Sequence, residues 1–101
     1  MTYPALILHC KALKLPELTA EYKFHPTRKW RFDYCMESEM IGIEINGGIF
    51  IQGRHTRGAG QQKDMEKLNE AQRLGYRVFQ FTPKEANSGV AANYLFKVIY
   101  E

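Results

Sequence analysis

Two stretches of alternating residues, 30–36 and 41–46, most constrain what this chain can fold into. Each alternates with period two, as a β-strand does, and the four residues of the break between them are Glu, Ser, Glu and Met. This spacing predicts an antiparallel hairpin with one wholly apolar face. Across that face the predicted pairs are Phe32 with Ile45, Tyr34 with Ile43, and Met36 with Ile41.

The other face of the predicted hairpin carries two acids. The same register pairs Asp33 with Glu44, Cys35 with Gly42, and Arg31 with Asn46. Like charges that lie directly opposite destabilise a sheet, so this acid pair needs solvent, a shared proton or a bound cation. The alternative is a register shifted by one residue, with both acids facing water. That shift would mix apolar and polar residues on both faces, which argues against it.

The rest of the chain alternates between helix and strand patterns. The expected elements are an amphipathic helix over residues 4–15, a strand over 19–24, a turn over 25–27, a helix over 61–74, a strand over 76–81, and a helix from Pro83 with a Thr82/Glu85 capping box. The strand over 76–81 is apolar on both faces, which is typical of a central, covered strand. Strand, helix and strand in succession imply a right-handed crossover and a parallel pair. We therefore expect one α/β domain over residues 1–101, with a mixed sheet, a central hairpin, a βαβ crossover and flanking helices.

Composition limits the class of protein. A length of 101 residues, 45% of them hydrophobic and 25% charged, suits one compact domain. The chain has no apolar run long enough for a membrane helix, and its first residues lack the order of a signal peptide, so we expect a cytoplasmic protein without a membrane partner. Two cysteines exclude a disulfide framework, and no His and Cys spacing suits structural zinc.

The acid pair is surrounded by cations, although the net charge is only +3. With a third acid, Glu21, on the neighbouring strand, Asp33 and Glu44 would offer the oxygen ligands that Mg²⁺ prefers. The flanking basic residues are Arg28, Lys29, Arg31, Arg54, His55 and Arg57. Surface ion pairs would explain any one of these cations, whereas a phosphodiester substrate explains both signs of charge at once.

The order of several motifs resembles a known family. The matching segments are Trp30-Arg31-Phe32-Asp33, Ile43-Glu44-Ile45-Asn46-Gly47-Gly48, Gly53-Arg54-His55, Lys63-Asp64 and Gly75-Tyr76-Arg77-Val78-Phe79-Gln80-Phe81-Thr82. Over about residues 20–82 the chain is similar to small phage-type endonucleases of the PD-(D/E)XK superfamily, close to very-short-patch-repair endonucleases and Holliday-junction-resolvase-like proteins. This resemblance implies a restriction-endonuclease-like fold and a DNA endonuclease dependent on Mg²⁺ or Mn²⁺. It also implies the cytoplasm of a host cell if the chain is phage-encoded.

The resemblance also implies roles for individual residues. Asp33 and Glu44 match the two metal-binding acids of the family, and Glu21 matches an additional acid near the N-terminus. Asn46 departs from the motif, which has a lysine at that place. The very-short-patch-repair enzymes use histidine, which makes His55 the favoured replacement. A displaced lysine, Lys63 or Lys67, is the alternative, and Gln80 could reach the same site from its strand.

Other interpretations remain beside this one. The main rival is a non-catalytic DNA-binding module on a degenerated nuclease fold, and a protein-interaction domain would leave the arginines unexplained. Trp30 is expected to pack at the edge of the hairpin, with base stacking as the alternative. Asn46-Gly47 indicates a tight turn, while the small residues Gly47 and Gly48 would also leave room for a DNA backbone. A symmetric homodimer would be the natural way for so small a nuclease to cut two strands.

Overall fold

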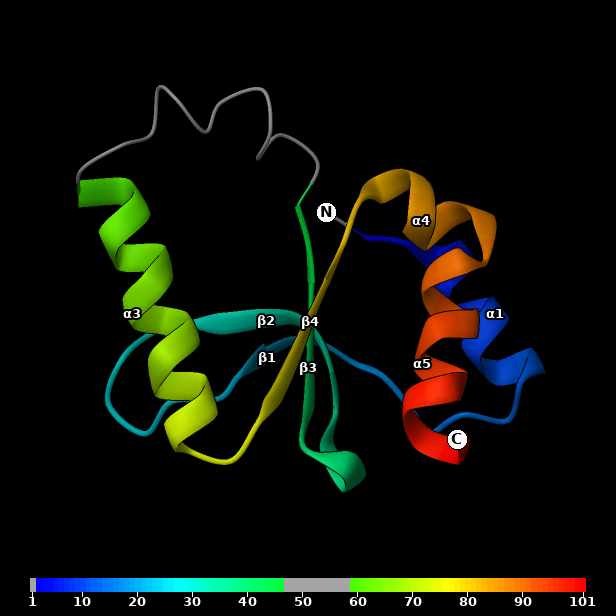
Figure 1. Cartoon of the computed structure of the whole chain (residues 1–101), viewed down its shortest axis with the longest axis horizontal. Coiled ribbons are helices and arrows are strands. Elements are labelled where there is room, and N and C mark those ends of the chain that lie inside the picture. The colour runs from blue at the N-terminus through cyan, green and yellow to red at the C-terminus, as the bar shows by residue number, and fades with distance from the viewer. Residues whose placement is uncertain (1, 47–58) are drawn as a thin grey trace.

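The computed structural model describes residues 2–46 and 59–101, and of residues 59–61 the backbone alone. The helices are α1 (Pro4–Ala12), α3 (Ala59–Arg73), α4 (Pro83–Ser88) and α5 (Val90–Tyr100). The strands are β1 (Thr19–Lys23), β2 (Arg31–Met36), β3 (Ile41–Ile45) and β4 (Arg77–Phe81). Helix α3 lies on one side of the sheet, and α1, α4 and α5 lie on the other (Figure 1). The chain therefore forms the expected α/β arrangement.

The four described strands form one mixed sheet in the order β1-β2-β3-β4. β2 pairs antiparallel with both β1 and β3, so the hairpin is central, as expected. β3 pairs parallel with β4, and α3 connects them, which confirms the βαβ crossover. The expectation that the strand at 76–81 is central is wrong for the described residues, where β4 is at the edge of the sheet. The apolar residues of β4 face helices on both sides of the sheet. Burial of both faces therefore does not show whether a strand has one neighbouring strand or two.

The hairpin between β2 and β3 has the expected register where the two strands pair. Tyr34, Cys35 and Met36 lie opposite Ile43, Gly42 and Ile41. One 3₁₀ turn, Glu37–Glu39, makes the connection, and Met40 completes it in the left-handed region with φ 53°. The four-residue loop is therefore confirmed.

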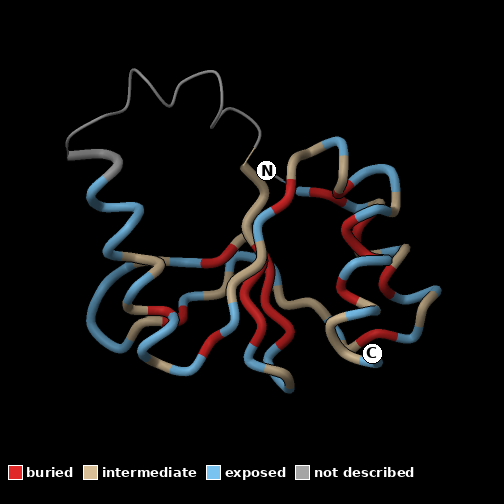
Figure 2. The backbone as a smooth tube through the Cα atoms, in the orientation of Figure 1, coloured by how far each residue is buried: buried red, intermediate tan, exposed pale blue. Residues whose placement is uncertain are grey.

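The core is divided between the two faces of the sheet. On the face of α1, α4 and α5, a large cluster includes Tyr34, Met36, Ile41 and Ile43. Figure 2 shows buried residues along the strands and along these helices. On the face of α3, a smaller cluster is mainly aromatic. It consists of Phe24, Phe32, Cys35, Ala71 and Tyr76, with Tyr22, Trp30, Leu74 and Val78 packed against it.

The expectation of a wholly apolar hairpin face is wrong at one residue. Phe32 belongs to the α3 cluster, together with Cys35, whereas Tyr34 and Met36 belong to the opposite cluster. The alternation along β2 therefore slips once, at Asp33. The ring of Phe32 lies over Gly42, where a Cβ would be only 2.6 Å from its Cε2 and Cζ atoms. The absence of a side chain at Gly42 provides the space for this ring.

The helix boundaries follow local signals. The opening helix, expected over residues 4–15, ends at Ala12. At α4 the expected capping box is present, because the Thr82 hydroxyl accepts from the Glu85 N–H and the Glu85 carboxylate accepts from the Thr82 N–H. Gly89, with φ 94°, separates α4 from α5 in a conformation that favours glycine.

Candidate active site at the diverging ends of β2 and β3

The two acids of the hairpin take part in the sheet itself. Backbone pairing of β2 with β3 ends at Tyr34 and Ile43, and beyond it side chains replace the ladder. The Ile45 N–H donates to Oδ2 of Asp33 at 2.7 Å, and the Asp33 N–H donates to Oε2 of Glu44 at 3.3 Å. Each carboxylate thus accepts a main-chain hydrogen bond from the strand that carries the other. The predicted proximity of Asp33 and Glu44 is confirmed, in a wedge where the strands diverge.

Glu44 receives a cation from the helix above the sheet. Lys67 of α3 donates from Nζ to Oε1 of Glu44, and the two side chains are 25% and 15% exposed. Burial raises the pKa of Glu44, and the negative charge of Asp33 acts in the same direction, while Lys67 lowers it. The wedge therefore holds two carboxylates, one of which is paired with an ammonium group, and it is partly screened from water.

The two amides at this end of the sheet form a second pair. Gln80 lies opposite Glu44 in the parallel ladder of β3 and β4. Its Oε1 accepts a hydrogen bond from Nδ2 of Asn46 at 2.8 Å, while the Asn46 main-chain N–H donates to Phe81. Asn46 stands two residues after Glu44, so its side chain and Gln80 lie beside the acids. The sequence prediction that Gln80 could reach this site agrees with the register.

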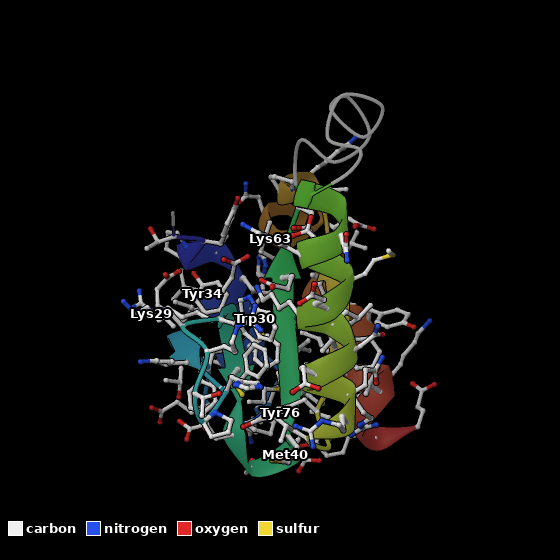
Figure 3. The ribbon with its side chains drawn as sticks, turned by 90° about the vertical axis from the view of Figure 1, so that its left-hand side faces the viewer. Lys29, Trp30, Tyr34, Met40, Lys63 and Tyr76 are labelled. Atoms are coloured by element: carbon white, nitrogen blue, oxygen red, sulfur yellow. The ribbon has the colours of Figure 1, made fainter. Side chains whose placement is uncertain are left out.

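Both lysines that could replace the motif lysine, Lys63 and Lys67, lie on α3. Lys67 contacts Glu44, whereas Lys63, labelled in Figure 3, lies one turn earlier and is exposed. Lys63 makes no ion pair with the described side chains. Both lysines occupy the same face of the helix, because residues four apart are neighbours there. The distance along the helix axis therefore decides which lysine reaches the acid. His55, the favoured replacement in the sequence analysis, lies outside the described residues, as do Arg54 and Arg57.

Glu21 is not brought into a group with the other two acids. Among the residues 2–46 and 59–101, no three His, Cys, Asp or Glu side chains lie close enough together to hold a metal ion. Glu21 is exposed and has a φ of 51°, between the pairs Ala20–Tyr34 and Tyr22–Phe32. The irregularity of β1 thus coincides with the slip of β2 at Asp33. The remaining donor set is two carboxylates, one of which, Glu44, already accepts an ammonium group. Such a pair fits a hard cation with further oxygen ligands from water or phosphate.

The basic residues before Asp33 are at the end of the sheet formed by β1 and β2. Arg31 is exposed opposite Lys23, and Lys29 is exposed in the preceding turn. Arg28 instead approaches Glu66 of α3 at 3.8 Å and lies over the Trp30 ring, 4.0 Å from its centroid. Lys23 was not singled out from the sequence. Its pairing with Arg31 is visible only once the register of β1 is known.

Among the described residues no helix is both long enough and apolar enough to cross a membrane. Comparison of the chain with protein-family models, with curated proteins and with solved structures gives no match.

Proposed function

We propose that this chain is a metal-dependent DNA endonuclease in which Asp33 and Glu44 hold Mg²⁺ or Mn²⁺. The observation that carries the proposal is the wedge between β2 and β3, where two carboxylates lie together and one of them already accepts a cationic group. A divalent ion bound there supplies a water of lowered pKa and stabilises negative charge on a phosphate. The resemblance to PD-(D/E)XK endonucleases supports the same assignment.

Each residue of the site has a separate role in this proposal. Asp33 and Glu44 are oriented by the main-chain N–H groups of Ile45 and Asp33, so the two carboxylate groups have little freedom to move. Lys67 would place its ammonium group next to the phosphate oxygens and offset the charge that develops in the transition state. It takes the place of the lysine that the family motif has where Asn46 stands. The Asn46–Gln80 pair borders the site on the side of β4.

The charges around the end of β1 and β2 support an anionic partner. Lys23 and Arg31 lie directly opposite each other, and neither makes an ion pair within the described part of the chain. Two like charges in this position disfavour pairing of the strands unless water or an anion offsets them. DNA phosphates would do so, and each neutralised phosphate contributes about 0.9 to the slope of log affinity against log salt on a duplex. Lys23→Ala and Arg31→Ala should each lower that slope.

The decisive experiment separates cleavage from binding. Purified protein is incubated with labelled linear, nicked, flapped and four-way DNAs in Mg²⁺, Mn²⁺ or EDTA. Asp33→Asn and Glu44→Gln keep an oxygen acceptor for the main-chain N–H but remove the charge, so both should abolish cleavage while the fold and DNA binding persist. Glu17→Gln, on an exposed acid away from the wedge, is the matched control and should retain full activity.

The rival function is a DNA-binding module without catalysis. It predicts salt-dependent binding that survives both acid substitutions and no divalent-dependent cleavage of any substrate in the panel. Cleavage at the normal rate by Asp33→Asn or Glu44→Gln would reject the proposed metal site.

A further inference from the structure

A hollow of about 470 Å³ lies between α3 and the turn that connects β1 to β2. It is open to solvent and separate from the wedge that holds Asp33 and Glu44. Its lining includes His25, Arg28 and Trp30 from the turn and Glu66, Asn69 and Glu70 from α3. In Figure 3, Trp30 lies beside α3 on the face of the sheet that this helix covers.

The Trp30 ring forms an ordered wall of the hollow. Phe24 lies nearly parallel to it, with ring centroids 6.4 Å apart, and His25 meets it edge-on at 5.3 Å. The Arg28 guanidinium covers the Trp30 ring at 4.0 Å from the centroid. A flat group is therefore already stacked on this indole, and half of the Arg28 side chain remains exposed.

His25 fixes the turn in place. Its Nδ1 accepts hydrogen bonds from the main-chain N–H groups of Thr27, at 3.2 Å, and Arg28, at 3.0 Å. Nδ1 is therefore unprotonated, so Nε2 carries the hydrogen and donates to Oε1 of Glu70 at 2.9 Å. These bonds tie the turn to α3 across the hollow. The position of Trp30 relative to Asn69 is thus set before any ligand arrives.

The charges of the hollow favour a neutral ligand over a phosphate. Glu66 partly offsets the Arg28 charge, and Glu70 is already paired with Arg73, so the hollow presents no unpaired cation to a phosphate among its described residues. The Asn69 side chain makes no hydrogen bond within the described residues and offers one acceptor and two donors. A flat, uncharged group with polar atoms along its edge would satisfy both the ring wall and the amide. A nucleobase has this chemistry.

We propose that this hollow binds an unpaired nucleobase of the DNA substrate, stacked on the exposed side of the Arg28 guanidinium that covers Trp30 and hydrogen-bonded at its edge by Asn69. The inference rests on the proposed function and names its substrate class, which is DNA with unpaired nucleotides near the cut. Trp30 is three residues before Asp33, so about 10 Å of strand separates the hollow from the wedge. A base within a duplex has both faces stacked on its neighbours, whereas an unpaired base is free to enter.

The chain provides its own probe for this binding. Trp30 is its only tryptophan, so intrinsic tryptophan fluorescence reports on the hollow alone. Protein in EDTA, which prevents cleavage, is titrated at one salt concentration with single-stranded oligonucleotides, a blunt duplex, and the same duplex with a single-stranded flap. A stacked base contributes roughly 5- to 150-fold to affinity. We expect saturable quenching by the single strands and the flap, with at least fivefold tighter binding than to the blunt duplex.

Two asparagines give a matched pair of variants. Asn69→Ala removes the amide from the hollow, and Asn93→Ala makes the same change on the exposed side of α5, in the opposite layer. Asn69→Ala should weaken the quenching titration at least threefold, and Asn93→Ala should leave it unchanged. Trp30→Leu, followed by fluorescence anisotropy of a labelled strand, should lose the preference for single strands. Thermal melts show whether each variant folds.

The outcomes separate this inference from the proposed function. Quenching that is absent, equal for the blunt duplex, or equal for the two asparagine variants would overturn the nucleobase site, even if cleavage with Mg²⁺ is normal. Quenching as expected without cleavage would support the nucleobase site and reject the nuclease. A hollow that serves a protein partner instead predicts no quenching by any DNA.

Discussion

Replacing Gly42 by alanine should destabilise the protein through a single, well-defined clash. The new Cβ would lie 2.6 Å from Cε2 and Cζ of Phe32, about 0.8 Å closer than the 3.4 Å at which ordinary contact begins. The Phe32 ring is only 1% exposed and cannot retreat, because Phe24 is stacked on it with centroids 4.1 Å apart. Overpacking of this kind typically costs about 1–3 kcal/mol. We expect a loss of about 2 kcal/mol in the free energy of unfolding.

Urea denaturation and thermal melts measure this loss. For a domain of this size, about 1 kcal/mol corresponds to roughly 4–8 °C in Tm, so Gly42→Ala should lower Tm by about 10 °C. Phe32→Ala removes all three clashing ring atoms, Cε2, Cζ and Cδ2, and costs stability on its own by leaving a cavity. The double variant should be more stable than the sum of the two losses predicts, by at least about 1 kcal/mol. Stability of Gly42→Ala equal to that of the wild type would refute the packing of Phe32 on this glycine.

Three further substitutions test charges and a helix cap. Lys67→Met should destabilise the protein at pH 7 and much less at pH 4, because protonated Glu44 no longer needs a cation. Urea denaturation measures both losses, and an equal loss of stability at the two pH values would contradict the ion pair. Arg73, and after it His25, lower the pKa of Glu70 to about 2, so ionised Glu70 stabilises the fold above about pH 4.5 and that contribution fades as the pH falls towards 2. The difference in urea midpoint between wild type and Glu70→Gln should therefore shrink over that interval, and a constant difference would exclude these contacts. Thr82→Ala removes the cap of α4 and should cost about 1 kcal/mol in thermal melts, whereas Thr27→Ala, in an exposed turn, should cost less.

The hairpin shows which parts of the fold can be predicted from the sequence. Alternation and a four-residue loop were sufficient for the pairs Tyr34–Ile43 and Met36–Ile41, because the pleat repeats every two residues. The same rule failed at Phe32, where β2 slips by one residue. That slip depends on Gly42 and on the left-handed conformation of Glu21, which lie on the two strands beside β2. No local pattern along β2 carries this information.

The candidate site was predictable to a similar extent. The proximity of Asp33 and Glu44 followed from the register alone, and Lys67 was one of two lysines that helical spacing could not separate. Only the position of α3 along the sheet selects Lys67. The hollow at Trp30 was beyond prediction, because it lies between a turn and a helix that are joined by the bond between His25 and Glu70, 45 residues apart in the chain.

The acids at the wedge have two separate roles, one in the sheet and one in the proposed reaction. Asp33 and Glu44 serve as acceptors for main-chain N–H groups that would otherwise lose their partners, so the sheet needs them whether or not a reaction takes place. A descendant of this chain without the proposed chemistry would therefore be expected to keep a side-chain oxygen acceptor at both positions, as an acid or as its amide. We expect Lys67 to be substituted first, because its removal leaves no main-chain donor unpaired. The lysine is thus the more telling sign of a working site, although the acids are the more visible one.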